Sequence, residues 1–154
     1  MVTDYGQDVL VESFVEGSEF TVAIVGYDPV QTLPVIQRAV DAGSGIGLHV
    51  LDRKGLPEVD RDWALPGDLT PDLERRLESA ALAVYNKLEC KDFARIDFRV
   101  DQAGQVWFLE INPLPTFAPD GTFAIMAELM GQSYPDFLAS VLAEALRRVA
   151  PGDA

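Results

Sequence analysis

The residues best suited to do chemistry are two carboxylates, Asp97 and Glu110, in the stretch 93–115. The first half of this stretch alternates apolar and polar residues, the middle contains a glycine-bearing turn, and the second half is β-branched and aromatic. This pattern predicts a β-hairpin. If Val100 pairs with Gln105 across the turn, the two carboxylates become diagonal neighbours, about 7 Å apart at Cβ. Carboxylates at that separation can hold a hard cation, which prefers oxygen ligands.

The same register gives the hairpin one polar face. Arg95 would lie opposite Glu110, and Asp97 and Asn112 would project from the same side. A slip of one residue would place the two acids on opposite faces, so a metal site here depends on the register. The acids could instead be solvated or paired with Arg95 and Arg99, and the spacing alone leaves both interpretations open.

The hairpin resembles the metal-binding hairpin of the ATP-grasp ligases, most closely that of the D-alanine–D-alanine ligases and their relatives. The matching residues are Arg-Ile-Asp-Phe from Arg95 and Leu-Glu-Ile-Asn-Pro from Leu109. The resemblance implies that Asp97, Glu110 and Asn112 hold two Mg²⁺ (or Mn²⁺) ions against the phosphates of ATP. It also implies that Arg95 steadies the transferring phosphoryl group.

A second block, residues 11–20, resembles the adenosine-binding segment of the same family. The resemblance implies that Glu12 lies near the adenine amino group and that the backbone of Phe14 and Val15 hydrogen-bonds the adenine edge. It implies that Glu19 accepts from the ribose hydroxyls. By itself this block also fits a plain hairpin with exposed acids. It gains weight because it precedes the metal hairpin by about 80 residues, a separation similar to that in the family.

The stretch 41–54 is the least readable part of the chain. Its glycines suggest a phosphate loop, but no strong strand precedes them and no helix clearly follows, so the dinucleotide fingerprint fails and we expect a mobile loop. ATP-grasp ligases have a substrate-covering loop here with a lysine aimed at the γ-phosphate. The resemblance implies Lys54 as its counterpart, although the flanking residues depart from the usual pattern. His49, the only histidine, is interpreted as structural.

The loop 113–121 has three prolines in seven positions, which excludes regular structure and predicts a substrate-contacting loop beside the hairpin. In the D-alanine–D-alanine ligases, a glycine of this loop allows close backbone approach, and a serine holds the carboxylate of the second D-alanine. Matched residue by residue, Thr116 replaces that glycine and Gly121 replaces that serine, with Asp120 beside it. The departure implies an amine substrate other than free D-alanine, unless a one-residue gap puts Thr122 in the serine's place.

The remaining pattern predicts the elements that must position these residues. A continuous apolar run predicts a strand buried on both faces, and capping residues mark the helices. The expected elements are strands at 8–16, 19–27 and 33–38, a turn-rich connection at 63–68, a helix from Pro71 capped by Thr70 and ending near Cys90, a helix at 122–130 followed by Gly131, and a final helix capped by Ser133 with Asp136. In the final helix we expect a core stripe of Phe137, Leu138, Val141, Leu142, Ala145, Leu146 and Val149, with Met126 and Met130 in the same core.

The predicted fold is α+β, the C-terminal domain of an ATP-grasp ligase, with a mainly antiparallel sheet and helices packed on one face. We expect one domain over 1–150 and a disordered tail at 151–154. The resemblance implies that the N-terminal domain and most of the central domain of a ligase, with the flap and two phosphate-binding lysines, lie outside this sequence. A full-length parent could form a homodimer.

Composition restricts the partners. The formal net charge of -13 argues against nucleic acid and anionic membrane surfaces. No apolar run approaches the ~18 residues that a membrane-spanning helix needs. Cys90 is the single cysteine, so an internal disulfide is impossible, which fits the reducing cytoplasm.

The resemblance implies an ATP-dependent ligase that forms C–N bonds. A carboxylate would attack the γ-phosphate of ATP to give an acylphosphate, and an amine would then displace phosphate to form an amide. These 154 residues alone are expected to be incomplete as an enzyme. Two alternatives remain open: a non-catalytic nucleotide-binding or interaction module derived from such a ligase, and an acidic cation-binding domain unrelated to ATP.

Overall fold

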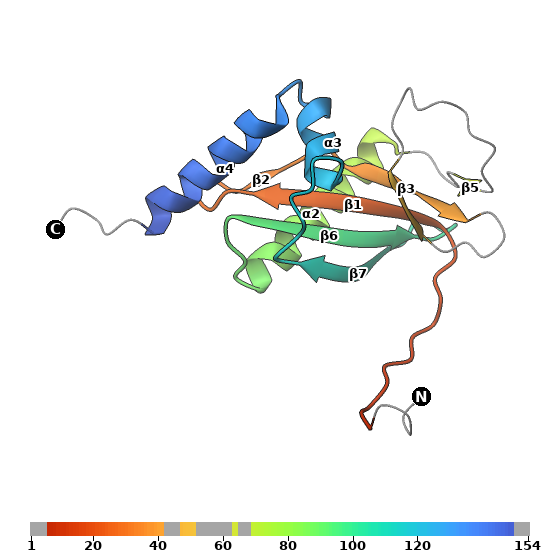
Figure 1. Cartoon of the computed structure of the whole chain (residues 1–154). Helices are drawn as coiled ribbons and strands as arrows, with labels where there is room; N and C mark the ends of the chain where they lie inside the picture. Colours follow the sequence, from red (N-terminus) through yellow and green to blue (C-terminus); the bar gives the residue numbers. More distant parts are fainter. Residues whose placement is uncertain (1–5, 42–46, 52–62, 65–68, 150–154) are drawn as a thin grey trace.

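The computed structural model describes residues 6–41, 47–51, 63–64 and 69–149 (Figure 1). The strands and helices in these ranges are, in chain order, β1 (Ser18–Val25), β2 (Gln31–Thr32), β3 (Ile36–Asp41), β4 (Gly47–Leu51), β5 (Trp63–Ala64), α2 (Pro71–Lys87), β6 (Phe93–Val100), β7 (Val106–Asn112), α3 (Thr122–Leu129) and α4 (Tyr134–Val149).

The strands form one antiparallel sheet in the order β4-β3-β1-β6-β7, with β2 paired to β1 and β5 paired to β3. β1 lies in the middle and is buried along its whole length. It pairs with β6 over eight positions, from Ser18 opposite Val100 to Val25 opposite Phe93. This arrangement confirms the predicted α+β class and its mainly antiparallel sheet.

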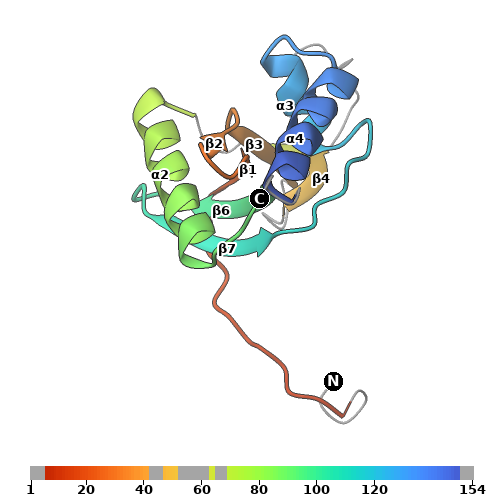
Figure 2. The same ribbon diagram turned by 90° about the vertical axis from the view of Figure 1, so that its left-hand side faces the viewer.

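The helices cover both faces of the sheet, so the prediction that they pack on one face is wrong. Figure 2 shows α2 on one side of the sheet and α3 and α4 on the other. The cause lies in β1, which has apolar side chains on both faces of the sheet. Phe20, Val22 and Ile24 pack into the core beneath α2, whereas Ala23 and Val25 join the core beneath α3 and α4.

The boundaries of α2 follow its capping residues. The Thr70 hydroxyl accepts a hydrogen bond from the Leu73 amide at 3.2 Å, and Pro71 occupies the first turn. The helix ends at Lys87 with Leu88 as its C-cap, slightly before the predicted end near Cys90. The cap residues therefore predicted the start of the helix more sharply than its end.

The caps predicted around α3 and α4 are confirmed. Gly131 follows α3 with a φ of 71°, as expected of a glycine after a helix. Ser133 precedes α4: its hydroxyl oxygen accepts from the Asp136 amide at 3.3 Å and its proton is donated to the Asp136 carboxylate at 2.6 Å. Met126 and Met130 belong to the core between these helices and the sheet, as predicted.

The predicted core stripe of α4 is only half right. Phe137, Leu138 and Val141 pack in the core, but Leu142, Leu146 and Val149 are 53–66% exposed. The C-terminal end of α4 extends past the edge of the sheet (Figure 1). This half of the helix contacts the described residues through polar side chains: Glu144 accepts from the Tyr27 amide, and Arg148 pairs with Asp92.

Four predictions about the strands are corrected. The run 8–16 forms no strand and is exposed, because none of the described strands pairs with it. Residues 47–51, expected in a loop, form β4, and 63–64, expected in a turn, form β5. β3 begins at Ile36, later than predicted. Lys54 lies outside the described residues. Among the described ranges, no helix is long and apolar enough to cross a membrane.

Candidate functional site

The hairpin of β6 and β7 has a different register from the predicted one. Val100 pairs with Val106, where Gln105 was expected, and the ladder stays regular up to the pair Phe98–Phe108. The register then shifts by one residue, and the next pair joins Asp97 to Glu110. Leu109 is the extra residue in this β-bulge.

The bulge decides on which face Glu110 lies. A regular ladder continued from Phe98–Phe108 would put Leu109 opposite Asp97 and turn Glu110 toward the α2 face. With the bulge, Glu110 lies directly opposite Asp97, and Arg95 lies opposite Asn112. The four polar residues therefore share one face, as predicted, but Asp97 and Glu110 are direct rather than diagonal neighbours, and Arg95 does not lie opposite Glu110.

Asp97 is the buried centre of this polar face. Its side chain is only 3% exposed. Oδ1 accepts a hydrogen bond from the Thr21 hydroxyl at 2.7 Å, and Oδ2 accepts from Arg95 Nη2 at 2.9 Å. Arg38 Nη1 is 3.8 Å from Oδ2. Each oxygen of this carboxylate has a hydrogen-bond donor and two guanidinium groups lie nearby, which offsets the cost of burying it at this depth.

Arg95 joins the two carboxylates of the hairpin. The same Nη2 atom that contacts Asp97 also donates to Glu110 Oε1 at 3.2 Å. Asn112, the third predicted metal ligand, uses its Oδ1 to accept from the Leu114 amide at 3.0 Å. No group of three or more His, Cys, Asp or Glu side chains that could hold a metal occurs among the described residues, so a cation here would need the amide oxygen of Asn112.

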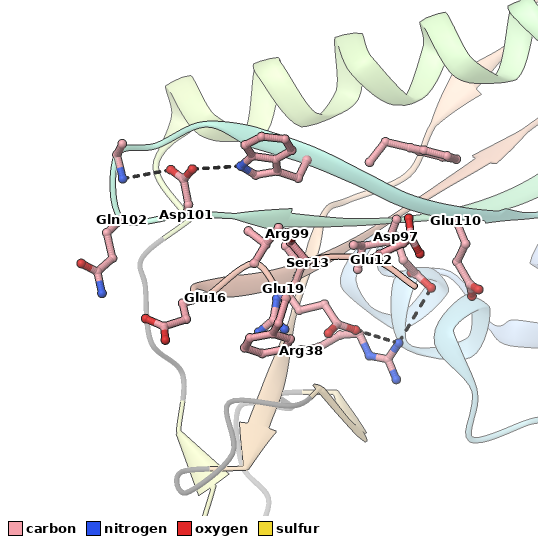
Figure 3. A pocket seen from close by; sticks show the side chains of 16 residues that line it. Glu12, Ser13, Glu16, Glu19, Arg38, Asp97, Arg99, Asp101, Gln102 and Glu110 are labelled. Carbon is pink, nitrogen blue, oxygen red and sulfur yellow. Dashed lines mark hydrogen bonds and ion pairs between the residues drawn. The ribbon is translucent and has the colours of Figure 1, made fainter. Parts of the chain in front are cut away.

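An open cleft of about 1090 Å³ lies beside these carboxylates, between the sheet and residues 12–16 (Figure 3). It brings together residues from both predicted blocks, which lie far apart in the sequence. The predicted site residues that line it are Glu12, Phe14, Val15, Glu19, Asp97 and Glu110. Arg95 and Asn112 do not line the cleft itself. Arg95 is next to it because it donates to Glu110, and Asn112 is the partner of Arg95 across the hairpin.

Arg38 also lines the cleft and was missed by the sequence analysis. It lies on β3 opposite Glu19 of β1, and its Nη1 is 3.1 Å from Glu19 Oε1. Figure 3 shows its guanidinium between Glu19 and Asp97. Arg38 has the same parity along β3 as Ile36, whose side chain faces away from α2, but the sequence does not show that this face meets Glu19.

Arg99 and Trp107 also line the cleft and were also missed. The Arg99 guanidinium lies 4.5 Å from the centre of the Phe14 ring and donates to the Gly17 carbonyl at 3.0 Å. Trp107 Nε1 donates to Asp101 Oδ2 at 2.9 Å. This bond, with those from the Gln105 and Ala103 amides, lowers the pKa of Asp101. Through its contacts with Phe14 and Gly17, Arg99 helps to hold segment 12–17 against the hairpin.

The predicted substrate loop has no regular structure, as expected, and leads from β7 to α3. Its Phe117 ring packs edge-on against Phe93 at 4.8 Å, which fixes the middle of the loop to the core. Thr116 and Asp120 are exposed, and Gly121 is the N-cap of α3 without a side-chain cap. None of these three lines the cleft. The first turn of α3 thus offers backbone amides but no hydroxyl in the N-cap position.

Solved ligases share this architecture. The D-alanine–D-alanine ligase of Bacillus anthracis complexed with ATP matches 88% of this chain and 39% of its own, with a TM-score of 0.64 and 24% identity. The ligase of Coxiella burnetii matches 89% of this chain and 34% of its own, with a TM-score of 0.66 and 20% identity. At these identities the likeness shows the fold, which is that of the ATP-grasp ligases.

The sequence gives the family. The model described as "D-ala D-ala ligase C-terminus" matches residues 1–143, and the chain belongs to this family. Uncharacterized protein y4sG of Sinorhizobium fredii is 31% identical over 148 residues, which cover 96% of this chain and 44% of that protein. The D-alanine–D-alanine ligase of Marinobacter nauticus is 32% identical over 138 residues, 90% of this chain and 40% of that protein. The chain thus spans about two fifths of these relatives' length.

Proposed function

We propose that this chain forms the ATP- and cation-binding part of a carboxylate–amine ligase, which makes an amide through an acylphosphate. The observation that carries the proposal is the pair Asp97–Glu110, bridged by Arg95 at the edge of a cleft that also contains Glu19. Residues from two blocks matching one ligase family line a single cleft. A nucleotide site requires the two blocks to meet in one cleft. A plain hairpin with solvated acids does not require it.

The cleft fits divalent cations better than it fits a free polyphosphate. Its acidic side chains include Glu12, Glu16 and Glu19, in addition to the Asp97–Glu110 pair. A triphosphate entering alone would meet this negative field, whereas a triphosphate carrying cations would not. Carboxylate and amide oxygens from Asp97, Glu110 and Asn112 form the oxygen-rich donor set that Mg²⁺ or Mn²⁺ prefers. Bound there, the cations would neutralise charge on the phosphates.

The other end of the cleft fits an adenosine. Phe14 and Val15 supply apolar surface and backbone groups, and Trp107 and Leu109 line the same cleft. Glu19 is held by its ion pair with Arg38, and a carboxylate can accept from both hydroxyls of a ribose. We therefore assign the adenine to the Phe14 end and the ribose to Glu19, with Glu12 near the exocyclic amine.

Arg95 supplies positive charge where a phosphoryl group would be transferred. Its guanidinium contacts both proposed metal ligands, so it lies within reach of any phosphate that those residues help to bind. A planar guanidinium can exchange a carboxylate partner for a phosphate oxygen without losing its hydrogen bonds. We propose that Arg95 makes this exchange during phosphoryl transfer and stabilises the charge on the moving group. Lys54 remains the proposed second positively charged side chain at the transferred phosphoryl group.

The amine substrate is proposed to differ from free D-alanine. The loop 113–121 presents Thr116 and Gly121 where the ligases carry a glycine and a serine, and Asp120 is exposed beside the start of α3. A substrate carboxylate there would lack a hydroxyl donor and would face a like charge. A neutral or cationic amine avoids both penalties.

The proposal is tested by calorimetric titration of the protein with a non-hydrolysable ATP analogue, with and without Mg²⁺. We expect Mg²⁺-dependent binding that Asp97→Asn or Glu110→Gln removes while circular dichroism stays unchanged. Glu128→Gln, an exposed acid on α3, is the matched control and should bind like the unmodified protein. Unchanged metal and nucleotide binding in both site variants would contradict the assignment. A purely non-catalytic module would bind the analogue but would show no turnover. ATP-dependent phosphate release by a full-length protein containing this chain, strongly lowered by Arg95→Gln, would therefore favour the ligase over that alternative.

A further inference from the structure

Arg38 contacts two carboxylates to which the proposed function gives different tasks. Its Nη1 atom is 3.1 Å from Glu19, the proposed ribose acceptor, and 3.8 Å from Asp97, the proposed cation ligand. The three residues come from three adjacent strands, β3, β1 and β6. Their side chains are 14%, 11% and 3% exposed, so solvent screens the contacts poorly. The sugar end and the metal end of the cleft therefore share one guanidinium.

We propose that Arg38 is a positioning residue that couples nucleotide binding to cation binding; this inference rests on the function proposed above. In the ligand-free cleft, Arg38 and Arg95 supply the positive charge that a buried Asp97 needs. A divalent cation approaching Asp97 Oδ2 enters the space that both guanidinium groups face. The two guanidinium groups repel the cation, and the cation must replace them in neutralising the Asp97 carboxylate.

The phosphates of a nucleotide remove this conflict. When they arrive with the cation, the charge of Arg38 can be shared between Glu19 and a phosphate oxygen. The attraction of the phosphates to both Arg38 and the cation then outweighs the repulsion between the two positive charges. Cation alone and nucleotide alone should each bind weakly, and each should strengthen the other by the same factor, as linkage requires. Arg38 is thus expected to make the empty site selective for the cation–nucleotide complex over the bare ion.

A merely structural Arg38 would behave differently. If it served only to pair with Glu19 and hold β3 against β1, its replacement would lower the stability and weaken every ligand alike. The coupling role predicts effects of opposite sign, with tighter binding of the bare cation and a smaller gain on adding nucleotide. A loss of stability alone would not tighten the binding of the bare cation while reducing the gain on adding nucleotide.

The test measures Mn²⁺ binding by electron paramagnetic resonance, with and without a non-hydrolysable ATP analogue, for the unmodified protein and Arg38→Gln. We expect Arg38→Gln to bind Mn²⁺ alone about five-fold or more tighter, and to lose at least that factor of cooperativity. Arg38→Lys keeps the charge and should retain most of the coupling. Arg75→Gln, an exposed arginine of α2, is the control and should change neither value. Arg38→Met, which keeps the aliphatic stem, replaces Arg38→Gln if circular dichroism shows that the latter is unfolded.

Equal Mn²⁺ affinity and equal cooperativity in Arg38→Gln and the unmodified protein would overturn the inference and leave the proposed function intact. A parallel loss of both ligands would overturn it as well, in favour of the structural role. Failure of the unmodified protein to bind Mn²⁺ and the analogue together would instead overturn the proposed function, and the coupling with it.

Discussion

The hydroxyl of Thr21 donates a 2.7 Å hydrogen bond to Oδ1 of Asp97, and the two residues are 1% and 2% exposed. They are direct partners across β1 and β6, so the bond is set by the sheet register. It occupies one carboxylate oxygen with a neutral donor. The other oxygen, Oδ2, is left to face the guanidinium groups of the cleft. Thr21 therefore selects which oxygen of Asp97 is available to a ligand.

Replacing Thr21 should damage both stability and metal binding. Thr21→Val keeps the shape but leaves a buried carboxylate oxygen without its donor, at a cost of about 1–3 kcal/mol in the free energy of unfolding. Because Asp97 is a proposed metal ligand, losing the hydrogen bond behind it should weaken Mn²⁺ binding in the presence of nucleotide by about 10–100-fold. Urea unfolding and metal titration check the two effects. Thr21→Ser should recover most of both, and a Val variant with unaltered metal affinity would contradict the assigned role.

The Asp101 carboxylate should report on the Trp107 side of the cleft. Its pKa is lowered chiefly by the bond from Trp107 Nε1 and further by the amides of Gln105 and Ala103. A lowered pKa means that the ionised carboxylate stabilises the hairpin above its ordinary pKa and that this contribution is lost as pH falls through the lowered value. Trp107→Phe should raise the pKa of Asp101 toward its ordinary value. A ¹³C NMR titration of the carboxyl carbon measures it, and an unchanged pKa would contradict the prediction.

Gly17 should be irreplaceable where the cleft segment meets the sheet. Its φ is 144°, and a Cβ added there would lie 2.0 Å from the Val100 carbonyl oxygen. Gly17→Ala must push residues 12–16 away from the hairpin, which should cost more than the roughly 1–3 kcal/mol of backbone strain alone and weaken nucleotide binding. Gly104→Ala is the matched control, since its φ is also positive, at 77°, but its Cβ would meet nothing within 4 Å. Equal stability of the two variants, measured by urea unfolding, would refute the proposed contact.

The amine preference can be tested at the start of α3. Gly121→Ser adds a hydroxyl in the N-cap position, although its Cβ would lie 3.2 Å from the Ala118 carbonyl oxygen. In the full-length protein we expect this change to lower KM for D-alanine as the amine substrate relative to a neutral or cationic amine. Steady-state kinetics with a panel of amines measures it. If the unmodified protein already prefers D-alanine, and Thr122→Ala raises that KM sharply, Thr122 takes the serine's place and the proposed preference is wrong.

Local signals predicted the elements well where each residue had a single local task. The cap at Thr70, the pair Ser133–Asp136 and the glycine at 131 marked helix ends that the structure confirms. The same reasoning failed for 8–16, because an apolar run shows that a strand is possible without showing that a partner strand exists. It also failed for 47–51, where glycine and histidine weaken the signal of a strand that is formed by pairing with β3.

The site was harder to predict because it depends on non-local geometry. Glu19, Asp97 and Glu110, which the structure brings into one cleft, were proposed from their motifs. Arg38 was not, since only the pairing of β3 with β1 places it opposite Glu19. The bulge was also invisible. Every residue from Val106 to Leu109 is apolar or aromatic, so no alternation reveals where the register shifts.

That bulge determines which change in length the hairpin can accept. Deleting Leu109 would restore a regular ladder and still leave Phe98 opposite Phe108 and Asp97 opposite the glutamate. Deleting Val106 would also preserve the acidic pair, but it would move Trp107 to the face that packs under α2 and place Phe108 opposite Arg99 on the other face. A homologous hairpin one residue shorter can therefore keep the same carboxylate pair, and it should lack its residue at the position of Leu109.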